Sequence, residues 1–234
     1  MIQNLIFDLG GVLLNIDLPH CMNSVKSLGV DFDGLSSHPS FASMPTSQKP
    51  AVMGEGVVAT GAVHLYQIGE ITTEQFIGSI QQLCRQGTTY QQVLDAWNTC
   101  CIDIPQYRLD KILQLRQQGY HTYMLSNTND AHWQYIIRQC FGGQEQVGKY
   151  FDKTFLSQEM HLAKPNDDIY LTMLQEIGAQ PADCLFIDDS TPNLEAAAAL
   201  GFHTFHADVS KTQNGKVIAP PATEWKDQID HLLQ

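Results

Sequence analysis

Residues 5–12 are Leu-Ile-Phe-Asp-Leu-Gly-Gly-Val, and they are the segment from which the fold is best predicted. Its three leading apolar residues are typical of a short buried strand, and the run ends at Asp8 and the turn signal Gly10-Gly11. A carboxylate therefore stands at the point where a strand gives way to a turn. We predict that Asp8 lies at the carboxyl end of a buried strand.

Four similar apolar runs follow along the chain, each bounded by polar or turn residues. They cover residues 121–125, 153–156, 184–187 and 203–206. Between them, apolar residues recur at helical spacing, and the patterns stop at Gly119, Gly178 and Gly201, which is a C-cap signal. Strands that alternate with helices are joined by right-handed crossovers. The sequence therefore predicts an α/β fold with a doubly wound, Rossmann-like parallel sheet that helices cover on both faces.

Residues 17–104 do not follow this alternation. Thr72 and Gln75 have the spacing of a capping box, and apolar residues repeat at helical spacing after them. We therefore predict an α/β core formed by residues 1–16 plus 105–234, with residues 17–104 as a small, all-helical cap. An insert after the first strand would lie over the carboxyl ends of the strands, where ligands bind in such sheets.

Two other patterns have ordinary explanations. The glycine-rich stretch 54–61 lacks the Gly-Lys-Ser/Thr ending of a phosphate loop, so we expect a flexible loop there. The six cysteines show neither a C-x-x-C pair nor zinc-site spacing, which indicates reduced and mostly buried thiols. The pair Cys100-Cys101 is a candidate for oxidation only if it is exposed.

Composition and charge exclude several classes of function. Hydrophobic residues make up 43% of the chain and charged residues 16%, a balance that favours a folded globular protein over a disordered one. The net charge of −12 and the lack of a Lys/Arg cluster argue against a nucleic-acid or anionic-lipid partner. The apolar runs are far shorter than the roughly 20 residues of a membrane span, and no signal-peptide pattern is present. We expect a cytoplasmic protein, either a monomer or a homodimer.

Polar residues gather directly after the predicted strands, where a doubly wound sheet presents its ligands. Asp8 could attack phosphorus in line, and the following glycines would let main-chain amides approach phosphoryl oxygens. The Ser126 hydroxyl and the N–H groups of its loop, that of Asn127 included, could bind a phosphate oxygen, although a plain helix N-cap explains that segment equally well. Lys164 could neutralise negative charge on both Asp8 and a phosphoryl group, whereas a lone lysine is more often solvated.

The stretch Phe-Ile-Asp-Asp-Ser-Thr-Pro-Asn, residues 186–193, is the most informative local signal. Asp188 and Asp189 follow a buried strand and repel each other unless a cation lies between them and Asp8. Carboxylate oxygens are hard ligands that suit Mg²⁺. The alternative is an acidic turn that caps the next helix. It would be favoured only if the motifs around Asp8, Ser126 and Lys164 were absent.

Taken in order, these four elements resemble the four motifs of haloacid dehalogenase-like hydrolases, and the resemblance runs over nearly the whole chain. Segments 125–129, 156–159 and 186–189, together with Lys164-Pro165 and Ile169-Tyr170, look especially like bacterial sugar-phosphate phosphatases of the α-glucose-1-phosphate type. The resemblance implies a Mg²⁺-dependent phosphomonoester hydrolase that acts on a small phosphorylated metabolite, a sugar phosphate, through an aspartyl phosphate.

The same resemblance assigns roles to individual residues. Asp8 is the nucleophile, and Lys164 and Ser126 are the other catalytic groups. The implied phosphate ligands are Gly10, Gly11, Ser126, Asn127 and Lys164. The implied Mg²⁺ ligands are Asp8, the carbonyl of Gly10, Asp188 and Asp189.

Gly10 departs from the pattern of most phosphatases in this superfamily, which carry a second Asp there as the general acid and base. Loss of that second Asp costs a factor on the order of 10²–10⁴ in rate for a poor leaving group. A sugar 1-phosphate releases a more acidic hemiacetal oxygen and needs this proton less, and the sugar-phosphate subgroup also carries glycine there. Asp17 is a candidate substitute, with helix capping an equal alternative. His20 and His38 are candidates for substrate contact, although surface or packing histidines are commoner.

Two other functions remain open. A 2-haloacid dehalogenase shares the fold and the Asp nucleophile but uses no metal, and the pair Asp188-Asp189 argues against it, because extra anions would harm a site for a carboxylate substrate. The other is a catalytically inactive binding or regulatory relative, which Gly10 and the unusual glycine-rich stretch in the cap suggest.

Overall fold

A five-stranded parallel sheet lies at the centre of the molecule in the computed structural model, which describes residues 1–30, 51–53, 57–59 and 61–233. The strands, in spatial order, are β7 (Lys153–Leu156), β6 (His121–Ser126), β1 (Asn4–Phe7), β8 (Cys184–Asp188) and β9 (His203–His206). All five predicted strands are confirmed. Because β1 is central and Phe7 pairs with both Met124 and Ile187, the next residue, Asp8, lies in the middle of the carboxyl edge of the sheet.

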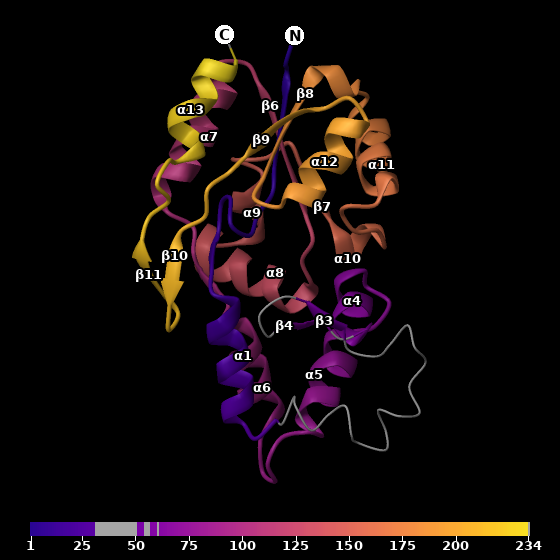
Figure 1. Ribbon diagram of the computed structural model, residues 1–234, viewed down its shortest axis with the longest axis vertical. Helices are drawn as coiled ribbons and strands as arrows, with labels where there is room; N and C mark the ends of the chain where they lie inside the picture. Colours follow the sequence, from indigo (N-terminus) through magenta and orange to yellow (C-terminus); the bar gives the residue numbers. More distant parts are fainter. Residues whose placement is uncertain (31–50, 54–56, 60, 234) are drawn as a thin grey trace.

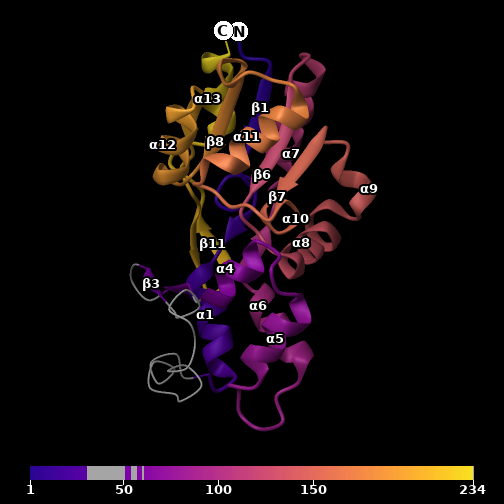
Figure 2. The same cartoon turned by 90° about the vertical axis from the view of Figure 1, so that its right-hand side faces the viewer.

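Helices cover both faces of this sheet, as Figures 1 and 2 show. On one face lie α7 (Gln106–Gln117), α8 (Asp130–Ile136) and α13 (Trp225–Leu232), and on the other lie α11 (Asp167–Ile177) and α12 (Thr191–Ala199). Successive residues of a strand point to opposite faces, so Leu5 and Phe7 pack in the first layer whereas Ile6 packs in the second. The doubly wound α/β architecture predicted from the sequence is therefore confirmed.

Local signals set several helix ends where the sequence predicted them. Helix α11 stops at Gly178, whose φ of +66° is the left-handed C-cap conformation that glycine adopts without strain. Helix α5 (Thr73–Gln81) begins with the expected capping box between Thr72 and Gln75. Within the described residues, no helix combines the length and the apolar character that crossing a membrane requires.

A helical insert lies at the end of the molecule opposite the two chain termini (Figure 1). Its described helices are α1 (Leu18–Ser27), α4 (Gly61–Gln67), α5 and α6 (Tyr90–Asn98). They enclose a small core of their own, in which Tyr66, Phe76, Ile77 and Val93 are buried. Two connections join the insert to the sheet, β2 (Asn15–Ile16) and β5 (Cys101–Asp103), and they pair with each other as an antiparallel ribbon.

The prediction that the insert is all-helical is wrong. Residues Ala51–Met53 (β3) and Val57–Ala59 (β4) form a two-stranded antiparallel ribbon. The expected loop over residues 54–61 is accordingly wrong for residues 57–59, which are strand, and for Gly61, which begins α4. Residues 54–56 and 60 of that stretch lie outside the described residues. Valine at two of the three β4 positions is the local strand signal that the glycines obscured.

A β-hairpin between β9 and α13 was not predicted. Its strands are β10 (Lys211–Gln213) and β11 (Lys216–Ala219), and they run beside the start of α1 (Figure 1). The turn residues Asn214 and Gly215 have φ of +51° and +71°, values that suit the Asn-Gly pair. The remaining described elements are the π-helix Ile137–Phe141, α9 (Gln144–Val147), α10 (Ser157–Met160) and the 3₁₀-helix Pro181–Asp183.

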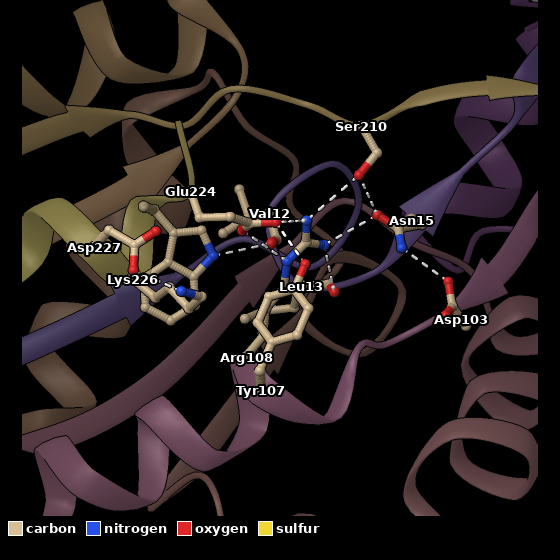
Figure 3. A network of polar contacts seen from close by, with 11 residues as sticks. Val12, Leu13, Asn15, Asp103, Tyr107, Arg108, Ser210, Glu224, Lys226 and Asp227 are labelled. Carbon is tan, nitrogen blue, oxygen red and sulfur yellow. Dashed lines mark hydrogen bonds and ion pairs between the residues drawn. The ribbon is translucent and has the colours of Figure 1, made fainter. Parts of the chain in front are cut away.

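Buried Arg108, on α7, ties the loop after β1 to the C-terminal part of the chain (Figure 3). Its guanidinium donates to both carboxylate oxygens of Glu224, at 3.2 and 3.0 Å, and to the carbonyl of Leu13 at 3.0 Å. It also donates to Oδ1 of Asn15, at 3.1 Å, at the entrance to the insert. The Trp225 indole donates to the carbonyl of Val12, so the chain that follows Asp8 is held from two sides.

Replacing Glu224 by glutamine is expected to lower the free energy of unfolding by about 3–5 kcal/mol, because it leaves the buried Arg108 charge uncompensated. The matched control is Glu176→Gln, which removes an ion pair to Lys153 in which both side chains are about half exposed, and about 1 kcal/mol or less is expected there. Urea denaturation measures both. Equal effects of the two variants would contradict the role assigned to Arg108.

Candidate active site

Asp8 begins the turn after the central strand, and its amide still donates to the carbonyl of Ile187 at 2.9 Å. This hydrogen bond continues the pairing of β1 with β8 and aims the carboxylate at the edge of the sheet. Asp8 is only 8% exposed, and the Lys164 ammonium lies 2.9 Å from its Oδ1. The prediction that Asp8 lies at the end of a buried strand is confirmed, and its carboxylate is paired with the Lys164 ammonium.

Lys164 joins two of the predicted motifs. Its side chain is 1% exposed, and its ammonium also lies 2.6 Å from Oδ2 of Asp188. The Asn127 side chain clamps its main chain, donating to the Lys164 carbonyl at 2.8 Å and accepting from the Lys164 amide at 2.9 Å. Burial alone would lower the pKa of Lys164, but Asp8 and Asp188 raise it above its ordinary value. The lysine therefore stays charged between the two carboxylates.

Asp188 is fully buried, and donors already surround its carboxylate. The Ser190 amide donates to Oδ1 at 2.8 Å, and the Asn193 side chain donates to Oδ1 and Oδ2 at 3.1 and 3.2 Å. Lys164 occupies the remaining side of Oδ2. Asp188 therefore positions Lys164, and the neighbouring Asp189 is the freer carboxylate for a ligand.

Asp189 lies directly over the main chain of Gly11. A Cβ atom on Gly11 would approach Oδ2 of Asp189 to 2.5 Å, and the φ of Gly11 is +81°. Both the close approach and the left-handed backbone require glycine at this position. The turn after β1 therefore brings Asp189 close to Asp8, although the two are 181 positions apart in the sequence.

The carboxylates of Asp8, Asp188 and Asp189 form a group that suits a divalent cation. Each offers an oxygen atom, and these atoms lie within 4.8 Å of one another. The pKa of Asp8 is raised to about 6, chiefly by burial and also by Asp188 and Asp189, while Lys164 opposes the rise. Burial and Asp188 also raise the pKa of Asp189. Three carboxylates against one ammonium leave an excess of negative charge, and this hard-oxygen set matches Mg²⁺.

Residues 126–129 lie at the carboxyl end of β6, which flanks β1 on the side opposite β8. Ser126 ends that strand and is 2% exposed, and the Thr128 amide donates to the hydroxyl of buried Ser157 at 3.0 Å. The helix-capping role belongs to Asn129, whose Oδ1 accepts from the His132 amide. Capping therefore does not use the Ser126 hydroxyl. Because the Asn127 side chain is engaged with Lys164, a part for Asn127 in phosphate binding falls to its main-chain N–H.

Residues considered as substitutes or extra contacts have other surroundings. Asp17 is 2% exposed and accepts from the amides of His20 and Gly215, both at 2.9 Å, so it caps α1 as the alternative interpretation had it. The ring of His20 packs against Gly215. His38 lies outside the described residues. Cys100 and Cys101 are both buried, so the condition for their oxidation is not met.

Sequence reasoning missed two supporting residues, Asn193 and Ser157. Asn193 belongs to the quoted stretch 186–193, and its place five residues after Asp188 puts it on the first turn of α12, facing back to that carboxylate. Ser157 follows β7 and binds both the amide and the carbonyl of Thr128. Its position after a strand was the signal available for it.

Comparison with known proteins agrees with this geometry. A family model described as haloacid dehalogenase-like hydrolase matches residues 2–201. The chain is 28% identical to the D-ribitol-5-phosphate phosphatase of Bacteroides thetaiotaomicron over 234 residues, which is 100% of this chain and 99% of the relative.

Solved structures give the same picture. A haloacid dehalogenase family enzyme of Bacteroides thetaiotaomicron, in complex with magnesium and inorganic phosphate, has a TM-score of 0.73 at 32% identity and covers 91% of this chain and 97% of its own. A hydrolase of the same type from Porphyromonas gingivalis has a TM-score of 0.76 at 29% identity, with coverage of 100% and 98%. The chain belongs to the haloacid dehalogenase-like hydrolase family.

Proposed function

We propose that the protein is a Mg²⁺-dependent phosphatase that hydrolyses a small phosphorylated sugar or polyol through an aspartyl phosphate on Asp8. The observation that carries the proposal is the buried lysine between two carboxylates at the centre of the sheet edge, Asp8–Lys164–Asp188, with Asp189 beside them. The relative of similar length is named a ribitol-phosphate phosphatase, which supports the substrate class.

The residues of this chain suit a two-step displacement. Oδ1 of Asp8 is paired with Lys164, so Oδ2 is the oxygen that attacks phosphorus. The P–O bond to the sugar then breaks, and the leaving oxygen takes the electron pair. Water attacks the phosphorus of the aspartyl phosphate in the second step, which restores the carboxylate and releases phosphate. Lys164 stabilises the negative charge that shifts between Asp8 and the phosphoryl group.

A magnesium ion would be held by Asp8, by the Gly10 carbonyl and by Asp189, with Asp188 next to it. When bound, it supplies positive charge to the phosphoryl oxygens and to the carboxylates. The Ser126 hydroxyl and the N–H groups of Gly11 and Asn127 are the proposed phosphate donors.

The helical insert, within the predicted range 17–104, is proposed as a cap over this edge. The Tyr66 hydroxyl accepts from the Ala131 amide at 2.9 Å, and the His161 ring contacts the Ile68 carbonyl at 2.9 Å. Ala131 lies at the start of α8, after β6, and His161 follows α10, after β7, so the insert contacts segments that follow the carboxyl ends of these strands. Asp8 lies on this same side of the sheet, and substrate choice would depend on the cap.

The two alternatives make different use of the same residues. A dehalogenase needs no cation, and it would place its carboxylate substrate beside Asp188 and Asp189. The inactive relative is suggested by Gly10 and by the glycine-rich stretch 54–61. The ion pairs of Lys164 with Asp8 and Asp188, and the closeness of Asp189 to both carboxylates, favour the phosphatase over both alternatives.

Replacement of Asp8 by asparagine is expected to abolish phosphate release, because the amide cannot form the acyl phosphate, while the fold persists. A panel of sugar and polyol phosphates, nucleotides and p-nitrophenyl phosphate, assayed with Mg²⁺ and with EDTA, measures the activity. Circular dichroism checks the fold. Turnover by Asp8→Asn would refute the nucleophile, chloride release from a 2-haloacid without Mg²⁺ would favour the dehalogenase, and no turnover of any panel member would favour the binding protein.

Introducing the missing acid at Gly10 is expected to raise activity on poor leaving groups. A Cβ there would lie 3.7 Å from the Ile16 side chain, an ordinary contact, and the backbone of Gly10 is not left-handed. Gly10→Asp should raise kcat/KM for a primary alkyl phosphate tenfold or more, towards the ~10²–10⁴ of general acid catalysis. The value for p-nitrophenyl phosphate should change little. The control is Gly10→Asn, and an equal gain from it would show that the proton is not the cause.

Stabilisation by Mg²⁺ is expected to increase with pH. With its pKa raised to about 6, Asp8 keeps a proton in the folded protein between about pH 4 and 6, where the unfolded chain has lost it. The metal-free protein therefore loses stability as pH rises through that interval. Protons compete with the cation, so the apparent Mg²⁺ affinity should be about tenfold lower at pH 5 than at neutral pH.

Thermal denaturation at pH 5 and pH 7, with and without Mg²⁺, measures this effect as a change in Tm. The shift should be larger at pH 7 and should disappear at both pH values in Asp189→Asn. The same Mg²⁺ shift at both pH values would contradict a site that includes Asp8.

A further inference from the structure

We propose that the hairpin after β9, residues 210–219, is a strap that sets the orientation of the helical insert by binding its first connection. Asp17 and Gly215 are then positioning residues for substrate binding. The inference concerns the orientation of the insert relative to the sheet. Only the kinetic part of its test rests on the proposed function.

Three successive residues of the first connection each receive a hydrogen bond from the strap. The Ser210 hydroxyl donates to Oδ1 of Asn15 at 2.7 Å, and the Thr212 hydroxyl donates to the carbonyl of Ile16 at 3.0 Å. The Gly215 amide donates to Oδ2 of the next residue, Asp17. Figure 3 shows the first of these contacts, where Ser210 and Arg108 share the amide oxygen of Asn15. The strap therefore follows the connection residue by residue instead of touching it at one point.

Asp17 is the joint at which the strap, the insert and the second connection meet. Its Oδ1 caps α1 through the His20 amide, and its Oδ2 accepts from the Gly215 amide at 2.9 Å. Its own amide donates to the carbonyl of Cys100, at the end of the insert. The side chain is 2% exposed, so water offers little replacement for a lost partner. Loss of the strap contact would leave a buried carboxylate oxygen at the start of α1.

The tip of the strap is shaped for this contact. Gly215 has φ of +71°, and a Cβ on it would lie 2.8 Å from the ring of His20 on α1. A larger residue would therefore push the tip away from the helix. The Asn-Gly turn thus lets the main chain come within hydrogen-bond distance of Asp17.

The base of the strap is anchored next to the candidate active site. The Ala207 amide donates to the carbonyl of Asp188 at 3.0 Å, and the strap begins three residues later. The base therefore belongs to the sheet while the tip binds the connection. A strap of this kind restricts the angles that the insert can take relative to Asp8. Loosening it should weaken binding of substrates that contact the insert and leave the chemical step unchanged.

The test compares Asp17→Asn, Gly215→Ala and a control, Thr72→Asn, by hydrogen exchange and by kinetics. In Asp17→Asn, the amide oxygen can still cap α1. The amide NH₂ group then faces the Gly215 N–H, so the acceptor of the strap contact is lost. Thr72→Asn changes the cap of α5, within the insert and without strap contacts. The proposal expects both strap variants to speed exchange several-fold in Leu18–Ser27 and Lys211–Ala219, with no change in β1 or β6 and none in Leu18–Ser27 for the control.

In kinetics, both strap variants should raise KM for a turned-over sugar or polyol phosphate several-fold and leave kcat for p-nitrophenyl phosphate within twofold. The double variant should be no worse than either single one, because both remove the same contact. Unchanged exchange in α1 would overturn the proposal, and so would an equal loss of kcat on both substrates. The exchange result stands even if no phosphatase activity is found.

Discussion

The structure of the site depends on one interaction, the buried ammonium of Lys164 between Asp8 and Asp188. A charged lysine at this depth is costly unless carboxylates and hydrogen bonds surround it, and here both are present. Asn127 fixes its main chain, and Asn193 and Ser190 fix the carboxylate beyond it. Each of the four segments that reach the sheet edge therefore constrains the others.

This constraint also bears on the proposed second cation, Mg²⁺. One lysine cannot neutralise Asp8, Asp188 and Asp189 together, and burial with the two neighbouring carboxylates raises the pKa of Asp8. A divalent ion would lower the cost of keeping all three ionised. The same excess of negative charge that stabilises a bound metal would oppose a substrate phosphate without it, so metal and substrate are expected to bind together.

Much of the fold was predictable because it is encoded locally. The five strands are short apolar runs, and glycines such as Gly178 mark helix ends through their own backbone conformation. The members of the site were predictable as strand-end residues. Their pairing was not, because the Asn127 side chain turns to Lys164 only when two distant loops meet. The Arg108 network, which joins residues 13 and 224, likewise has no local signal. The β10–β11 turn had one, Asn214-Gly215, but the strap's contacts to Asp17 depend on tertiary structure.

Mass spectrometry of the acid-quenched protein, during turnover of a phosphorylated substrate with Mg²⁺, would show whether Asp8 receives the phosphoryl group. One phosphoryl group is expected on the peptide that contains Asp8, with unmodified Asp8 recovered after the substrate is exhausted. When turnover runs in ¹⁸O-labelled water, the label should appear in the released phosphate. Label in the Asp8 carboxylate, or phosphate release with no modified Asp8 peptide, would contradict this mechanism.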